Sequence, residues 1–156
     1  KVYAPVAKQA EQLGIFGHGY TYSAHPVCAA VALRAQQLIQ ERDIIGHVRR
    51  VAPQLKSRIE RLARFDFIGH LRAIGLIGAM EFAANSQTGE KFDPSQKIAA
   101  QAVAIIQRHG VILRALPGDI IGFCPPLIIT AAEIDDMFDR IESGLDEFSE
   151  LAAKLH

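Results

Sequence analysis

Long segments with helical spacing of apolar residues alternate with two pairs of short, glycine-punctuated apolar segments. This order constrains the fold more than any other feature of the chain. Helices are predicted over residues 2–13, 26–41, 46–64 and 95–110 and from Thr130 onward. Strands are predicted over 67–75, 76–82, 111–114 and 119–123. The pattern favours an α+β fold, in which a small antiparallel or mixed sheet has helices packed on one side.

The helix boundaries carry their own signals. Pro26 stands where a helix should begin, because the N–H group that proline lacks has no partner in a first turn anyway. Thr130 and Glu133 have the spacing of a capping box, and Gly110 is expected to end the helix before it. Pro53 lies inside a helical pattern, so it either kinks that helix or marks its true first turn.

Composition excludes several classes of partner. Hydrophobic residues make up 49% of the chain and charged residues 22%, as in an ordinary soluble domain, and 17 basic residues balance 17 acidic ones. That balance argues against nucleic acid or a membrane as a partner. The most apolar stretch, 120–132, is too short to span a bilayer. Cys28 and Cys124 are far apart, so we expect buried or half-buried thiols in a reducing, cytoplasmic setting.

The length of 156 residues suits one domain with a real core. The chain opens on Lys1-Val-Tyr-Ala-Pro5, with neither a signal-peptide core nor an initiator methionine. We therefore expect it to begin within a longer protein.

A loop rich in glycine and hydroxyl groups, His18 to Pro26, precedes a predicted helix start. Thr21 or Ser23 could join the helix amides in binding a phosphate or carboxylate there, or could merely cap the helix. His18 and His25 have no carboxylate or cysteine at ligand spacing, so we predict no metal site.

Two arginines lie in predicted strands. Arg114 ends an otherwise apolar strand, so it must reach solvent, find a carboxylate or bind an anionic ligand, for which its planar fork is suited. Arg72 is expected to have a structural role, bonding to loop carbonyls at a strand end. The acidic residues that open the last helix are expected to be solvated and to favour the helix dipole; they are Glu133, Asp135, Asp136 and Asp139.

Three blocks, in this order, resemble one family. Residues 18–33, HGYTYSAHPVCAAVAL, are similar to the conserved block of class III (ω-amino acid) aminotransferases that precedes an alanine-rich helix. Residues 71–82, LRAIGLIGAMEF, resemble that family's strand pair, and residues 123–135, FCPPLIITAAEID, resemble its PPL segment. The resemblance covers essentially the whole chain and identifies it as the C-terminal portion of such an enzyme.

The resemblance implies a fold type I transferase that depends on pyridoxal 5′-phosphate and works as a homodimer or dimer of dimers. Residues 1–25 would be the tail of the large cofactor domain, and 26–156 the small C-terminal α/β domain. Cofactor contacts are implied for Tyr20, Thr21 and Ser23, with Thr21 donating to the phosphate across the dimer interface. Arg114 falls where the pyruvate-using branch binds the substrate carboxylate.

Two departures from the family pattern stand out. Ala24 replaces the usual glycine, so its backbone geometry should be one that alanine tolerates. The Schiff-base lysine is absent, because Lys1 and Lys8 lie too close to Thr21 and the other lysines lie downstream. We therefore assign no catalytic residue within this chain.

The function implied is transfer of an amino group between an ω-amino acid or amine and a keto acid such as pyruvate. The chain alone should be inactive without its lysine. The alternative is a stand-alone α+β module that binds a ligand or partner without catalysis.

Overall fold

The computed structural model describes residues 2–15, 17 and 19–154. Lys1 and His18, which entered the sequence predictions, lie outside the described residues. The chain divides into two compact units, one up to Glu41 and the other from Arg42 onward.

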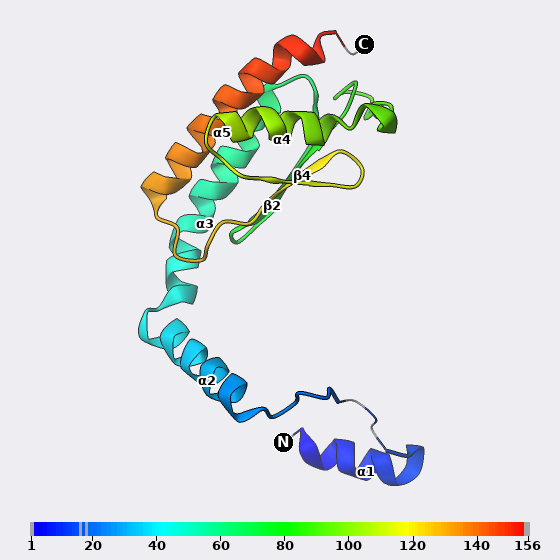
Figure 1. Ribbon diagram of the computed structural model, residues 1–156, viewed down its shortest axis with the longest axis vertical. Helices are drawn as coiled ribbons and strands as arrows, with labels where there is room; N and C mark the ends of the chain where they lie inside the picture. The colour runs from blue at the N-terminus through cyan, green and yellow to red at the C-terminus, as the bar shows by residue number, and fades with distance from the viewer. Residues whose placement is uncertain (1, 16, 18, 155–156) are drawn as a thin grey trace. The chain divides into compact units, whose positions relative to one another are not determined.

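The first unit holds two helices, and both match the prediction. Helix α1 (Tyr3–Leu13) ends at Gly14, whose φ of 90° suits a residue without a side chain. Helix α2 (Pro26–Glu41) begins at the predicted proline (Figure 1). Neither helix has a buried residue.

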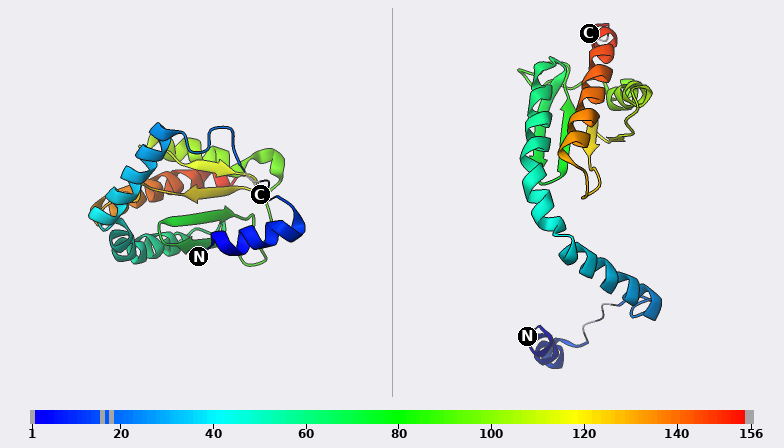
Figure 2. Two further views of the ribbon diagram at one scale, coloured as in Figure 1. Left: turned by 90° about the horizontal axis from the view of Figure 1, so that it is seen from below. Right: turned by 90° about the vertical axis from the view of Figure 1, so that its left-hand side faces the viewer.

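The second unit is an α+β layer, as predicted. Its helices are α3 (Ile44–Arg61), η1 (Leu62–Arg64), η2 (Pro94–Gln96), α4 (Ile98–Arg108) and α5 (Ala131–Ala152). Its strands are β1 (Ile68–Ile74), β2 (Ile77–Phe82), β3 (Arg114–Leu116) and β4 (Ile120–Phe123). They form one sheet in the order β1-β2-β4-β3, and every pair is antiparallel. Figure 2 shows this unit from two further directions.

Helices cover one face of the sheet. In β2 the buried side alternates strictly, with Met80 and Phe82 inside and Ile77 62% exposed. Helix α3 reaches the covered face through Ile59, whose Cδ1 would lie 2.3 Å from a Cβ built on Gly78. Helix α5 reaches the same face, where the rings of Phe123 and Phe138 lie 5.5 Å apart. The prediction of helices on one side is confirmed.

Among the predicted boundaries, two are wrong for local reasons, one because of a hydrogen-bonded motif and the other because of a left-handed residue. After α4, Gly110 N donates to Gln107 O and Val111 N donates to Ile106 O, the two bonds of a Schellman motif. The predicted strand 111–114 therefore starts only at Arg114. At the other end of the same helix, Lys97 adopts a left-handed φ of 50°, so α4 begins at Ile98 rather than at residue 95.

The alternatives for Pro53 are also resolved. It lies inside α3, which begins nine residues earlier at Ile44, so it does not mark the first turn. The predicted capping box is present, since Thr130 and Glu133 bond to each other's backbone N–H groups.

A buried arginine joins α3 to α5. Arg58 is only 8% exposed and donates to Glu142, itself 8% exposed, at 3.0 Å. Asp139 also accepts from Arg58, and an oxygen of Asp135 lies 3.6 Å from its Nη1. Two of the acidic residues predicted to be merely solvated thus pair with a buried cation.

Helices α4 and α5 touch at a glycine, which generates a prediction. A Cβ added to Gly144 would lie 2.9 Å from Ile106 Cα, closer than real contacts allow. We expect Gly144→Ala to lower the free energy of unfolding by about 1–2 kcal/mol, since overpacking outweighs the gain in helix propensity. Urea denaturation would measure it. Ser143→Ala, at an exposed position of the same helix, should change stability by less than about 0.5 kcal/mol. Equal stability of the two variants would contradict the packing argument.

Candidate functional site

A reciprocal pair of hydrogen bonds shapes the loop before α2. Ser23 N donates to Tyr20 O at 2.9 Å, and Tyr20 N donates to the Ser23 hydroxyl at 3.1 Å. Thr21 and Tyr22 are the central residues of this turn and both are exposed. The turn therefore presents Thr21 outward.

The start of α2 lies just beyond this turn. Ala29 N donates to His25 O at 2.9 Å and closes the first helical bond. The amides of Val27 and Cys28 precede that bond, so they are among the first-turn donors that lack a partner within the helix. Neither Thr21 nor Ser23 caps α2 by a side-chain bond to another described residue, so the capping alternative finds no support. Outward amides and a hydroxyl together suit a phosphate or carboxylate.

Ala24 differs from the expectation for its backbone. Its φ is 61°, in the left-handed region, where a Cβ crowds the following carbonyl at a cost of about 1–2 kcal/mol. The expected geometry, one that alanine tolerates easily, is therefore wrong. Ala24 is a central residue of a second turn, in which His25 N donates to Tyr22 O at 3.2 Å.

Arg114 is the first residue of β3 and lies on the uncovered face of the sheet. Across the sheet it pairs with Gly122 of β4, which pairs with Ala79 of β2, which pairs with Arg72 of β1. The Arg114 side chain is exposed and makes no hydrogen bond or ion pair with another described residue. The structural ion pair that the sequence left open is not formed within the described part of the chain.

Arg72 is structural, but its partner differs from the prediction. It donates to Glu81 at 3.1 Å and contacts Nδ1 of His70 at 3.2 Å, rather than binding loop carbonyls. Lys91 also donates to Glu81. The hydrogen bonds from Lys91 and then from Arg72 hold the pKa of Glu81 below its ordinary value. On the uncovered face Arg72 therefore forms an ion pair, whereas Arg114 forms none with another described residue.

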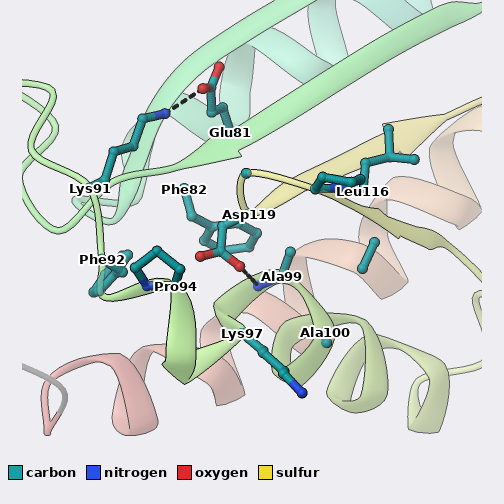
Figure 3. Close-up of a pocket in the computed structure, with 13 residues that line it drawn as sticks. Glu81, Phe82, Lys91, Phe92, Pro94, Lys97, Ala99, Ala100, Leu116 and Asp119 are labelled. Atoms are coloured by element: carbon teal, nitrogen blue, oxygen red, sulfur yellow. Dashed lines mark hydrogen bonds and ion pairs between the residues drawn. The ribbon is translucent and has the colours of Figure 1, made fainter.

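A groove lies between the β3–β4 hairpin and the start of α4 (Figure 3). It encloses about 480 Å³ and is lined by Leu116, Pro117, Gly118 and Asp119 of the hairpin, among others. The Asp119 carboxylate points to α4 and accepts a hydrogen bond from Ala99 N at 3.0 Å. This contact could not be predicted from the sequence, since the partners are 20 residues apart and no local motif relates them.

Neither a metal site nor a membrane-spanning helix is found among the described residues. They contain no group of three or more His, Cys, Asp or Glu side chains that could hold a metal ion. Cys28 and Cys124 are both exposed, so the expectation of buried or half-buried thiols is wrong. The reason is position, because α2 buries no residue and Cys124 follows the last residue of β4. No helix in the described ranges is long and apolar enough to cross a membrane.

Comparison with known proteins gives one family. The model of the family described as aminotransferase class-III matches residues 3–145. An uncharacterized aminotransferase, y4uB, of Sinorhizobium fredii is 36% identical over 147 residues, covering 93% of this chain and 32% of the relative. Gamma aminobutyrate transaminase 1, mitochondrial, of Solanum lycopersicum is 36% identical over 142 residues, covering 91% of this chain and 27% of the relative.

Solved structures agree. A structure described as a transaminase with L-ala is 36% identical, with a TM-score of 0.83, and covers 99% of this chain and 35% of its own. The PMP-bound aminotransferase from Vibrio fluvialis is 32% identical, with a TM-score of 0.83, and covers 96% and 32%. This chain thus spans about a third of the length of the proteins it matches. With the family model matching nearly its whole length, the chain belongs to the class III aminotransferases, whose cofactor is pyridoxal 5′-phosphate.

Proposed function

We propose that this chain is the C-terminal part of an aminotransferase that moves an amino group between an ω-amino acid or amine and a keto acid such as pyruvate. The observation that carries the proposal is the family match over residues 3–145, together with coverage of only a third of the relatives. Residues 1–25 would end the large cofactor domain, and 26–156 would form the small domain. The intact enzyme would be a cytoplasmic homodimer or dimer of dimers.

Thr21 would donate a hydrogen bond to the phosphate of the cofactor, across the subunit interface. Support comes from its exposed position at a turn that Tyr20 and Ser23 close, directly before the free first-turn amides of α2. This donor set fits a phosphate, which binds at helix N-termini through N–H groups and short hydroxyls. Pyridoxal phosphate, when bound, supplies the electron sink for amino transfer. Thr21 would keep that group fixed in place.

Arg114 would bind the carboxylate of the keto acid or amino acid. Its guanidinium has no competing carboxylate among the described residues, and beside it on β4 stands Gly122, which has no side chain to obstruct it. A bidentate pair with a carboxylate would orient the substrate. With an amine that has no carboxylate, the long exposed side chain is free to move aside.

The catalytic lysine would come from outside this chain. Every described lysine is exposed; these are Lys8, Lys56, Lys91, Lys97 and Lys154. Lys56 pairs with Glu60 and Lys91 with Glu81. An amine that attacks a carbonyl must be deprotonated, which burial favours and these ion pairs oppose. These exposed surroundings support the proposal that the catalytic lysine lies outside this chain.

The first test concerns the cofactor phosphate. In the intact enzyme, Thr21→Val should weaken pyridoxal phosphate binding about tenfold, because a hydrogen bond to a charged group contributes about 1.5 kcal/mol or more. Thr21→Ser keeps the hydroxyl and should bind nearly as well. Titration of the apoenzyme by absorbance would measure both. Equal affinity of the valine and serine variants would remove Thr21 from the cofactor site.

The second test concerns the substrate carboxylate. Arg114→Met should raise KM for pyruvate about 10- to 100-fold and leave KM for an aldehyde acceptor, which has no carboxylate, nearly unchanged. Arg72→Met is the matched control in the same row of the sheet, and it should not discriminate between the two acceptors. A parallel rise for both acceptors in Arg114→Met would contradict the assignment.

The third test concerns the lysine. The 156-residue chain alone, incubated with pyridoxal phosphate and borohydride, should give no stoichiometric adduct at a defined lysine and no amino transfer. Peptide mapping by mass spectrometry would locate any adduct. A single modified lysine with turnover would mean that the chain is catalytically complete.

A further inference from the structure

Asp119 is held by two different parts of the fold at once. Its carboxylate accepts from Ala99 N, in the first turn of α4, at 3.0 Å. Its main-chain carbonyl accepts from Phe82 N, at the end of β2, also at 3.0 Å. Its backbone is left-handed, with a φ of 53°, a conformation that aspartate tolerates better than most residues. Figure 3 shows the carboxylate directed at the helix.

The bond to Ala99 closes a segment of the chain on itself. Residues 99–119 run along α4, through the Schellman motif at Gly110, along β3 and back to the start of α4. Arg114 lies inside this closed segment. The chain on either side of Arg114 therefore leads to one of the two residues that this hydrogen bond joins.

Strand β3 is short, and its other restraints are its pairing with β4 and the packing of Ala115 against the core. It is three residues long and lies at the edge of the sheet, with β4 as its only neighbouring strand. Leu116, its last residue, is separated from Asp119 by Pro117 and Gly118 alone. Restraint on the hairpin turn is consequently transmitted within a few residues to the place where Arg114 stands.

We propose that Asp119 is a positioning residue for Arg114, which it serves by locking the β3–β4 hairpin to the N-terminus of α4. The proposal rests on the function assigned above to Arg114. The Asp119 carboxylate satisfies a helix amide that would otherwise lack a partner, and its charge is favourable at that helix end. Without this bond the hairpin turn would lose its tie to the first turn of α4 while keeping the bond from Phe82 N to Asp119 O, and the guanidinium would sample more positions. A displacement of about 1 Å is enough to weaken a bidentate contact substantially.

The structure suggests variants that separate backbone from side chain. Asp119→Gly keeps the left-handed backbone and removes the carboxylate, whereas Asp119→Asn keeps both an acceptor oxygen and tolerance of that backbone. Ala99→Pro removes the donor instead, in the first turn of α4, although Ala99 is only 2% exposed and the ring also adds volume to the core. It leaves Asp119 itself unchanged.

The test measures kcat and KM of the intact enzyme with pyruvate and with an aldehyde acceptor. We expect Asp119→Gly and Ala99→Pro each to raise KM for pyruvate about fivefold, the size expected for loss of a helix cap, with KM for the aldehyde unchanged. Asp119→Asn should stay within about twofold of the unaltered enzyme. A general loss of structure would instead affect both acceptors alike.

Two results would overturn the inference: no change in either acceptor, or equal changes in both. If one of these two variants does not fold, the KM ratio of the other for the two acceptors decides the question. Arg114→Met, measured in parallel, distinguishes failure of the role proposed for Asp119 from failure of the function proposed for Arg114. If Arg114→Met raises KM for pyruvate alone, and neither Asp119→Gly nor Ala99→Pro does so, only the role of Asp119 is refuted. If Arg114→Met changes KM for the two acceptors alike, the proposed function of Arg114 itself is refuted.

Discussion

The sheet has one covered face, and the rest of the arrangement depends on that constraint. Because side chains alternate along a strand, burying Met80 and Phe82 commits their neighbours in β2 to the other face. The antiparallel register carries this choice to every strand, so Arg72 and Arg114 share the uncovered face at opposite edges. A slip of one residue in β3 would turn the side chain of Arg114 toward the core. The placement of Arg114 is thus a consequence of hydrophobic burial elsewhere.

The helical layer contains a buried cluster of charged side chains. Arg58 is buried between α3 and α5, where Glu142 and Asp139 accept from it and the ring of Phe138 lies 5.8 Å from its guanidinium carbon. Its Nε finds no hydrogen-bond partner among the described residues. Buried ion pairs gain little net stability, but removing one partner leaves a costly charge. The cluster therefore fixes how α3 and α5 pair more than it strengthens the fold.

What could be predicted from the sequence was governed by contacts within a few residues or by simple periodicity. The helix start at Pro26, the Thr130 cap and the inward face of α5 all follow from such patterns. The partner of Arg72 could not be predicted, since it depends on the register between β1 and β2. The Asp119 contact was missed for the same reason. Each unpredicted feature joins residues that only the assembled sheet brings together.

The same distinction separates the two candidate binding residues. Thr21 stands in a turn closed by hydrogen bonds between residues three apart, so its local shape needs no tertiary support, and sequence motifs located it. Arg114 stands in a three-residue edge strand, whose position is inherited from β4, from the Schellman motif after α4 and from the Asp119 cap. Substitutions far from Arg114 in the sequence can therefore displace it without touching it. If Arg114 binds the substrate carboxylate as proposed, that contact should therefore be sensitive to changes in packing at residues distant from it in the sequence.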